Sequence, residues 1–321
     1  MNEIAPRSPA PAVRLNARSR AYTAKSKSAN TLRGYTADLA DFQTWCVNHD
    51  TRAVPAVPQT VVDYLTALAD GGLSVSTIQR RVAAIAFAHR TNNLDDPTTD
   101  PAVRVLLQGI RRTLTVAPTQ KSPITRDDLK ILLAHTTADL RGRRDRALLL
   151  IGFAGAFRRS ELAALTLADI TFQPAGIYIR LRHSKTDQEG AGLTKHIPAL
   201  ENSPLCPVRA LKVYLREAAI TDGAIFRKVD RWNNVSARAI DPDTVARIVK
   251  RLCSRAGMPV RDFAGHSLRS GFVTQATADG VDDWKIMRVT GHKSLAMLDR
   301  YNRDKGQGQE SAIRRALGES Q

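Results

Sequence analysis

Four side chains near the C-terminal end have types and spacings suited to chemistry on a phosphate. His266 and Arg269 are three residues apart, so they share a face if this stretch is helical. His292 follows a glycine, and Tyr301 lies nine residues further on. Each alone has an ordinary structural explanation: a helix-surface pair, a capping residue or a packed phenol. Together they would hold a phosphate between cations with a phenol in reach.

Two upstream residues would complete such a site. Arg158 opens the run Arg-Arg-Ser-Glu-Leu, and Lys185 lies in the polar turn Ser-Lys-Thr-Asp. Either alone would normally be a solvated surface residue. Two guanidiniums can clamp the non-bridging oxygens of a phosphodiester, and each charge-assisted hydrogen bond contributes about 1.5–3 kcal/mol.

The phenol would act as the nucleophile. Because the ordinary pKa of a tyrosine is about 10, Tyr301 needs nearby cations and a base at neutral pH. A histidine could take its proton, and a lysine or histidine could protonate the leaving alkoxide. The sequence has neither an acidic cluster that would hold Mg²⁺ nor a Walker-type phosphate loop. These residues predict a metal-free transesterification of DNA that needs no cofactor.

The charge of the chain favours a polyanionic partner. Its 321 residues include 48 Lys and Arg against 31 Asp and Glu, a formal net charge of +17. Double-stranded DNA is the predicted partner, and solubility alone is the alternative. There is no apolar run long enough to span a membrane and no apolar signal-peptide core. Three widely spaced cysteines favour buried thiols in a reducing cytoplasm, where the protein would lie with the nucleoid.

The N-terminal part is predicted to be a helical DNA-binding domain. Residues 1–28 are expected to be a flexible basic segment, with a DNA-contacting arm as the alternative. Apolar residues at three- and four-residue steps then predict an all-helical domain over residues 29–115. Its helices are expected to begin at about residue 29 and then to cover about 59–69, 74–91 and 101–114.

One side of this domain is basic. The stretch Thr77–Arg81 mixes Gln and Arg, which can reach base edges and phosphates in a major groove, although a solvated face is the alternative. The residues predicted to contact DNA, here and in later basic stretches, are Gln79, Arg80, Arg81, Arg111, Arg112, Lys121, Arg247 and Lys250.

A second domain is predicted after a basic linker at residues 116–123. Thr125 is a good helix N-cap, and the domain is expected to cover residues 124–301. Alternating apolar residues predict a strand at 176–183 that pairs with 193–198. Helices are expected at about 144–156, 207–218 and 243–256. The tail, 302–321, is expected to contain a short helix at 311–317.

These motifs occur in the order and rough spacing of the tyrosine recombinase (phage integrase) family, which the chain resembles over most of its length. The matching stretches are Arg158-Arg159-Ser160-Glu161-Leu162, Ser184-Lys185-Thr186-Asp187, His266-Ser267-Leu268-Arg269, Gly291-His292 and Tyr301. Upstream, residues 72–79 resemble part of the family's core-binding domain, and the layout is most similar to that of Cre recombinase. The resemblance implies a mainly α fold with a small β-sheet in the catalytic domain.

The resemblance also implies a role for each site residue. Tyr301 would form a 3′-phosphotyrosyl bond and release a 5′-hydroxyl. Lys185 would protonate that leaving oxygen, and His266 would serve the tyrosine as acid and base. The phosphate would be bound by Arg158, Arg269 and His292. Glu161 would hold an arginine or histidine in place, whereas Arg159, often apolar in the family, would have no catalytic role.

Site-specific recombination by a homotetramer on two paired duplexes, through a Holliday junction, is the implied function. The terminal helix would dock on a neighbouring protomer, with folding back on its own domain as the alternative. The two alternative functions are DNA relaxation and accessory DNA binding. A type IB topoisomerase, which relaxes DNA, shares the tyrosine chemistry, and a non-catalytic DNA-binding accessory protein could share the fold. The complete residue set argues against the second.

Overall fold

The structure, a computed structural model, describes residues 16, 18, 26–114, 121–182, 192–292 and 294–298. The chain divides into two compact units, one ending at Pro118 and the other beginning at Thr119. Within the described residues, no helix is both long enough and apolar enough to cross a membrane.

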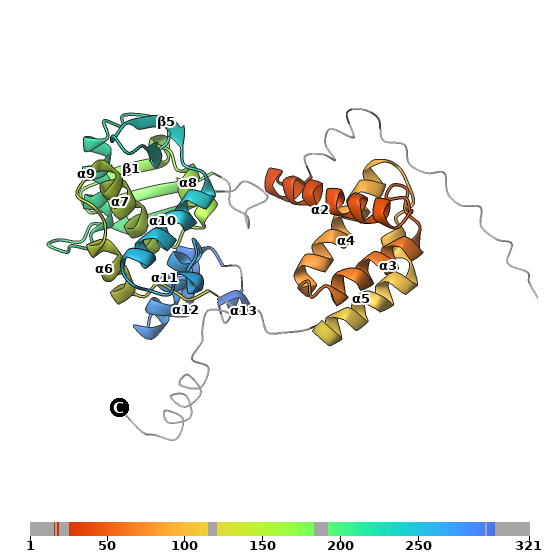
Figure 1. Cartoon of the computed structure of the whole chain (residues 1–321). Helices are drawn as coiled ribbons and strands as arrows, with labels where there is room; N and C mark the ends of the chain where they lie inside the picture. The colour runs from red at the N-terminus through yellow and green to blue at the C-terminus, as the bar shows by residue number, and fades with distance from the viewer. Residues whose placement is uncertain are drawn as a thin grey trace, which may run out of the picture. The chain divides into compact units, whose positions relative to one another are not determined.

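The N-terminal unit is helical throughout its described part (Figure 1). Its α-helices are α2 (Ala29–Asn48), α3 (Pro58–Asp70), α4 (Val75–Thr91) and α5 (Pro101–Leu114). Helices α2 and α4 begin at serine N-caps, Ser28 and Ser74, whose hydroxyls accept backbone N–H groups. The predicted helices are therefore confirmed to within a few residues at their ends.

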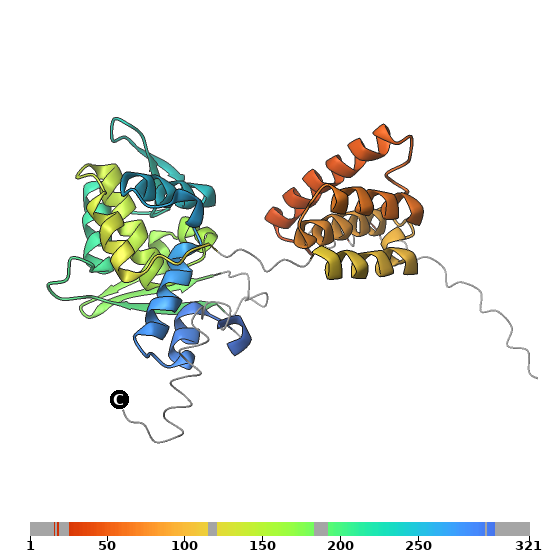
Figure 2. The ribbon, with the colours of Figure 1, turned by 60° about the horizontal axis from the view of Figure 1, so that its bottom comes forward.

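Apolar side chains hold this unit together. Helix α2 packs on α4, and α5 packs on α3 (Figure 2). Phe42, Tyr64, Ile85 and Val103 are fully or almost fully buried in the resulting core. Each of these side chains comes from a different helix, so burial of the shared apolar face fixes the helical packing.

The C-terminal unit combines helices with two small antiparallel sheets. Its α-helices are α6 (Arg126–Ala134), α7 (Leu140–Ala154), α8 (Arg159–Ala164), α9 (Pro207–Glu217), α10 (Pro242–Arg255), α11 (Ser267–Ala278), α12 (Asp283–Thr290) and α13 (Leu295–Leu298). Its strands are β1 (Ile170–Gln173), β2 (Gly176–Leu181), β3 (Leu193–Pro198), β4 (Arg227–Val229) and β5 (Val235–Ala239).

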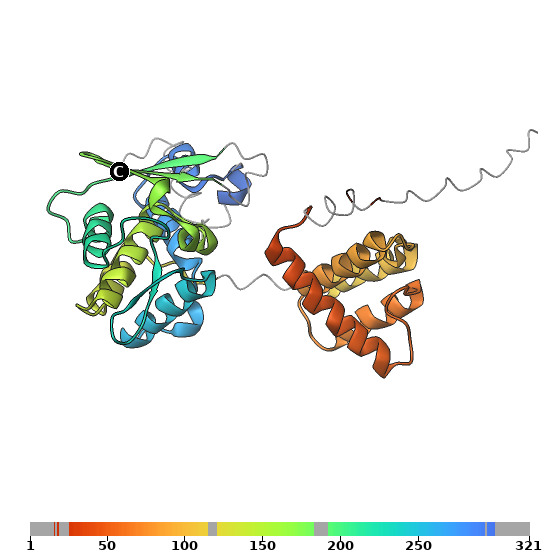
Figure 3. The ribbon, with the colours of Figure 1, turned by 90° about the horizontal axis from the view of Figure 1, so that it is seen from above.

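The larger sheet has the order β1-β2-β3 and lies along one side of the unit, with helices on its inner face (Figure 3). Ile177 pairs with Ile197, and Ile179 pairs with Lys195. Because side chains alternate between faces, these four residues point inward, whereas Tyr178 lies on the outer face. The inner face joins the main core around α7, where Leu148 to Ile151 are all buried.

Two features of this unit differ from the prediction. Strands β1, β4 and β5 were not predicted. They are only four, three and five residues long, and Val229 is their one buried residue, so each gives a weak strand signal. Helix α7 begins at Leu140 rather than near Arg144, because the Asp139 carboxylate accepts the Gly142 N–H at 2.8 Å and caps the helix earlier. The predicted helix at 311–317 lies outside the described residues.

Candidate active site

Arg158 lies at the N-cap of α8, just after the turn that ends α7. Glu161, one helical turn on, accepts the Arg158 backbone N–H at 2.9 Å and its Nη1 at 2.6 Å. The Glu161 side chain is only 4% exposed, so this ion pair is shielded from solvent. A carboxylate in the first helical turn is also favoured by the helix dipole. The pair fixes the position of the Arg158 guanidinium.

Arg269 lies in α11 and is 1% exposed, which is unusual for a charged side chain. Its Nη1 donates to the Ala156 carbonyl at 2.8 Å, and its Nη2 lies 2.9 Å from His292 Nε2. These contacts connect α11 to the turn before Arg158 and to the residue that follows Gly291. The buried guanidinium is thus oriented by fixed partners.

The hydrogen bonds around His292 assign a neutral ring. The Thr290 hydroxyl donates to the Ile286 carbonyl at 2.9 Å, so its oxygen accepts from His292 Nδ1 at 3.0 Å. Nε2 is then the acceptor that faces Arg269. Burial first, and then the charges of Arg269 and Arg158, lower the pKa of His292 to about 4. Both findings favour an uncharged imidazole at neutral pH.

His266 is exposed at the N-cap of α11, one turn before Arg269. Partial desolvation, and then the positive charges of Arg269 and Arg158, lower its pKa. The same two guanidiniums act on His292, so the structure brings both predicted arginines and both predicted histidines into one cluster. A neutral His266 is the form that can accept a proton.

Lys195 also belongs to this cluster, and sequence reasoning missed it. Its Nζ donates to the carbonyls of Gly155 at 2.6 Å and Val289 at 2.5 Å. Burial first, and then the charge of Arg269, lower its pKa to about 7. The alternation of the predicted strand could have identified it, because side chains two residues apart share a face and Lys195 is therefore on the same inward face as Ile197.

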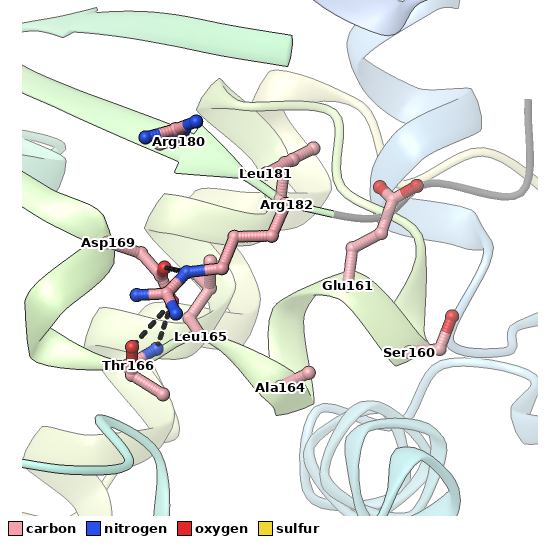
Figure 4. A pocket seen from close by; sticks show the side chains of 9 residues that line it. All are labelled: Ser160, Glu161, Ala164, Leu165, Thr166, Asp169, Arg180, Leu181 and Arg182. Atoms are coloured by element: carbon pink, nitrogen blue, oxygen red, sulfur yellow. Dashed lines mark hydrogen bonds and ion pairs between the residues drawn. The ribbon is translucent and has the colours of Figure 1, made fainter. Parts of the chain in front are cut away.

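A pocket of about 320 Å³ lies beside the site, between α8 and β2 (Figure 4). Within it, Asp169 accepts Arg182 Nε at 2.7 Å and the Thr166 hydroxyl at 2.6 Å. Figure 4 shows Arg182 reaching across to Asp169, while Glu161 projects from α8 elsewhere in the pocket. Because Arg182 follows directly on β2, the ion pair anchors the end of that strand.

Two predicted catalytic residues, Lys185 and Tyr301, lie outside the described residues. Arg159, to which no catalytic role was assigned, donates its Nη1 to Asp243 on α10 at 2.7 Å. The described part of the site therefore contains four of the six predicted catalytic residues, Arg158, His266, Arg269 and His292.

The residues predicted to contact DNA in the N-terminal unit have different environments. Arg80 forms two hydrogen bonds with the buried Asp38, at 2.7 and 2.8 Å, although the arginine side chain is 55% exposed. Arg81 is mostly buried and bonds Asp41 and the Tyr64 hydroxyl. Both ion pairs join α4 to α2, so these arginines have a structural role as well as any contact with DNA.

Gln79 and Arg111 lie side by side. With the Gln79 amide oxygen turned toward it, Arg111 donates to that oxygen at 2.6 and 2.9 Å. Arg112 is exposed on the same helix. Helix α5 thus presents cations next to the glutamine of α4.

The predicted DNA contacts of the C-terminal unit are all exposed. Lys121 donates to the Arg261 carbonyl at 2.7 Å, and Arg247 donates to Asp241 at 3.0 Å. Lys250 is exposed on α10, the helix that also carries Arg247.

An all-helical unit followed by an α+β unit is a fold that this chain shares with solved structures. The Tn1549 transposon integrase, solved in complex with transposon right end DNA, has a TM-score of 0.65 at 16% identity over 93% of this chain and 98% of that one. The XerH site-specific recombinase bound to palindromic difH substrate has a TM-score of 0.62 at 15% identity over 92% and 82%.

Sequence comparison identifies the family. Residues 123–307 match the phage integrase family, and residues 22–90 match the phage integrase N-terminal SAM-like domain. An integrase/recombinase XerD homolog of Selenomonas ruminantium is 41% identical over 90% of this chain and 85% of its own length. The recombinase Cre of Escherichia phage P1 is 25% identical over 81% and 80%. The chain belongs to the phage integrase family, and it is a tyrosine recombinase, as its motifs predicted.

Proposed function

We propose that this tyrosine recombinase cleaves and rejoins DNA at a specific site through Tyr301. The observation that carries the proposal is the cluster of two held guanidiniums and two imidazoles, Arg158, Arg269, His266 and His292. Such a cluster suits a phosphodiester that gains charge on its non-bridging oxygens as it is attacked.

In the proposed reaction the Tyr301 oxygen attacks the scissile phosphorus and gives its proton to His266. The bond from phosphorus to the 5′ oxygen breaks, and that oxygen takes a proton from Lys185. Arg158 and Arg269 neutralise the phosphate oxygens. The resulting 3′-phosphotyrosyl bond retains the energy of the phosphodiester, so rejoining by a 5′-hydroxyl needs no ATP.

His292 would act in two stages. In the described structure its Nε2 accepts a hydrogen bond from Arg269. An incoming phosphate raises the pKa of nearby cationic groups, so His292 would become protonated as the phosphate binds. Its Nε2 would then donate to a phosphate oxygen.

The other parts of the chain have proposed roles in assembly. Residues 29–115 and the linker at 116–123 would bind DNA together with the basic residues of the catalytic domain at 124–301. The tail at 302–321 would dock its helix on a neighbouring protomer. Four copies would act on two paired duplexes, through a Holliday junction, and the protein would work with the nucleoid in the cytoplasm.

A nicked suicide duplex tests the proposal. Its site is first selected from a randomised duplex pool by binding to the full chain. Incubation with the wild-type protein should give a covalent protein–DNA band on a denaturing gel, and Tyr301→Phe should give none. Persistence of the band in that variant would remove Tyr301 as the nucleophile.

The leaving-group role of Lys185 has its own test. Lys185→Ala should slow cleavage of the ordinary duplex but spare a duplex that has sulfur in place of the scissile 5′ oxygen, because a thiolate leaves without a proton. Equal slowing on both substrates contradicts that role. Relaxation of a plasmid that lacks the selected site would point instead to topoisomerase-like activity.

A further inference from the structure

Lys195 occupies a position where lysine is rare. It lies on β3 opposite Ile179 in the register and two residues before the buried Ile197. The residue is 4% exposed, although lysine is almost never fully buried unless its charge has partners. The cost of burying the Lys195 ammonium must therefore be offset by hydrogen bonds that an apolar side chain could not make.

The contacts of the ammonium connect two segments of the site. Its Nζ donates to the Gly155 carbonyl at 2.6 Å, at the end of α7, and to the Val289 carbonyl at 2.5 Å, in the last turn of α12. The Phe157 ring lies beneath it, with the ring centroid at 4.8 Å. Carbonyls at helix C-termini carry partial negative charge, which favours a cation there.

Each of these segments leads directly to a residue that would bind the phosphate. Three residues after Gly155 comes Arg158, and three residues after Val289 comes His292. The neighbouring carbonyl, that of Ala156, accepts from Arg269 at 2.8 Å. One lysine and one arginine from separate elements therefore fix the same short turn.

We infer that Lys195 is a positioning residue, which ties the turn before Arg158 to the end of α12 before His292 and so sets the spacing of the phosphate-binding groups. This inference rests on the proposed cleavage reaction. The charged groups that act on Lys195 come from separate elements: Arg269 on α11, and Glu161 and Arg158 on α8. Its two carbonyl contacts persist when the amine is neutral, because a neutral amine keeps two N–H groups.

The test measures the first-order rate of covalent complex formation by the full chain on the nicked duplex. Lys195→Met keeps the apolar stem and removes the N–H groups. A misplacement of about 1 Å can slow a reaction about 10²-fold, so we expect a loss of about that size on both the oxygen and the 5′-sulfur duplex. Affinity for intact duplex, measured in the Tyr301→Phe background, should change less than about twofold, because Lys195 is almost fully buried and most protein–DNA contacts are made by exposed groups.

Lys195→Arg separates positioning from proton donation. A guanidinium can donate to both carbonyls, but it does not lose its proton. Positioning predicts that this variant recovers most of the rate on the ordinary duplex. A proton donor would instead lose the rate in both variants and recover it on the sulfur duplex, an outcome that overturns the inference. The arginine variant also keeps the test decisive if Lys195→Met does not fold.

A matched control is available on the same domain. Lys212 lies on α9 with its Nζ 5.6 Å from the Phe172 ring centroid, but it is exposed. Lys212→Met should cleave at the wild-type rate. If wild-type protein forms no covalent complex, the proposed function itself fails. If wild-type protein cleaves and Lys195→Met cleaves equally fast, the positioning role is wrong.

Discussion

The arginines of the site are held by partners within the protein. Arg158 is paired with the buried Glu161, and Arg269 donates to the Ala156 carbonyl and to His292. Such prearranged donors stabilise developing charge without reorganising during the reaction. At the scale of single residues, the exact donor geometry should therefore matter more than the positive charge.

Substitution of Arg269 by lysine tests this expectation. Lysine keeps the charge but cannot reach Ala156, His292 and a phosphate at once, because it lacks the planar fork of donors. We expect Arg269→Lys to cleave about 10²-fold more slowly or worse, measured as the rate of covalent complex formation. Arg159→Lys is the matched control, because that arginine pairs with the exposed Asp243. Equal rates in the two variants would contradict a role for the Arg269 fork.

The lowered pKa of His292 predicts a pH dependence of stability. Its pKa is about 4 in the folded chain and about 6.5 when exposed. Between these values the unfolded chain binds the proton and the folded chain does not, so the free energy of unfolding falls as the pH drops from 6.5 to 4. His292→Asn should flatten this part of the profile, measured by urea unfolding at pH 6.5 and pH 5. The exposed His196→Asn should leave the slope as it is in the wild type, and an unchanged slope in His292→Asn would contradict the prediction.

At the scale of secondary-structure elements, a buried cluster of charged side chains connects α7 to α10 in the C-terminal unit. Asp145 on α7 accepts Arg144 Nη2 at 2.7 Å and also pairs with Arg251 on α10. The side chains of Arg144 and Asp145 are 4% and 3% exposed. Removal of the carboxylate would leave two guanidiniums without their counter-charge in a place with little water.

We therefore expect Asp145→Ala to lower the free energy of unfolding by about 3–5 kcal/mol. Urea unfolding followed by circular dichroism measures the change. Asp243→Ala removes an exposed pair on the same unit and should cost less than about 1 kcal/mol. A cost for Asp145→Ala as small as that of the exposed pair would show that the buried cluster contributes little.

Most of the long helices and two of the strands could be predicted from the sequence, and the exceptions have physical causes. Helices α2 to α5 have regular apolar spacing, so the pattern alone was enough to locate them. Strand β5 is only five residues long and mostly exposed, and two of its three alternating apolar residues are alanines, so its alternation is a weak signal. Lys195 was overlooked for a different reason. A lysine in a strand ordinarily faces solvent, and only its partners on α7 and α12, which are distant in sequence, show why it is buried.

At the scale of the whole molecule, the formal net charge of +17 is expected to attract DNA. Many arginines are already engaged in ion pairs within the protein, such as Arg80 with Asp38 and Arg126 with Asp279. Counting charges in the sequence therefore overstates the number of cations that are free to meet phosphates. The exposed Arg112 and Lys250 are better candidates.

The salt dependence of binding tests those two residues. Each phosphate contact contributes about 0.9 to the slope of log K against log salt concentration on duplex DNA. Arg112→Ala and Lys250→Ala should each reduce the slope by about that amount, measured by titration of the selected duplex in the Tyr301→Phe background. Lys130→Ala is the control, since Lys130 is paired with Asp127. If the salt slope of either variant equals that of Lys130→Ala, the substituted residue does not contact a DNA phosphate.

The measurement that tests the proposed chemistry most directly is the identity of the covalent bond. Full-length protein is trapped on the nicked selected duplex, digested with trypsin and nuclease, and analysed by mass spectrometry. We predict that the nucleotide adduct lies on the peptide that contains Tyr301, attached through the 3′ phosphate of the cleaved strand. An adduct on a different residue, or one that holds the 5′ phosphate, would contradict the proposed mechanism.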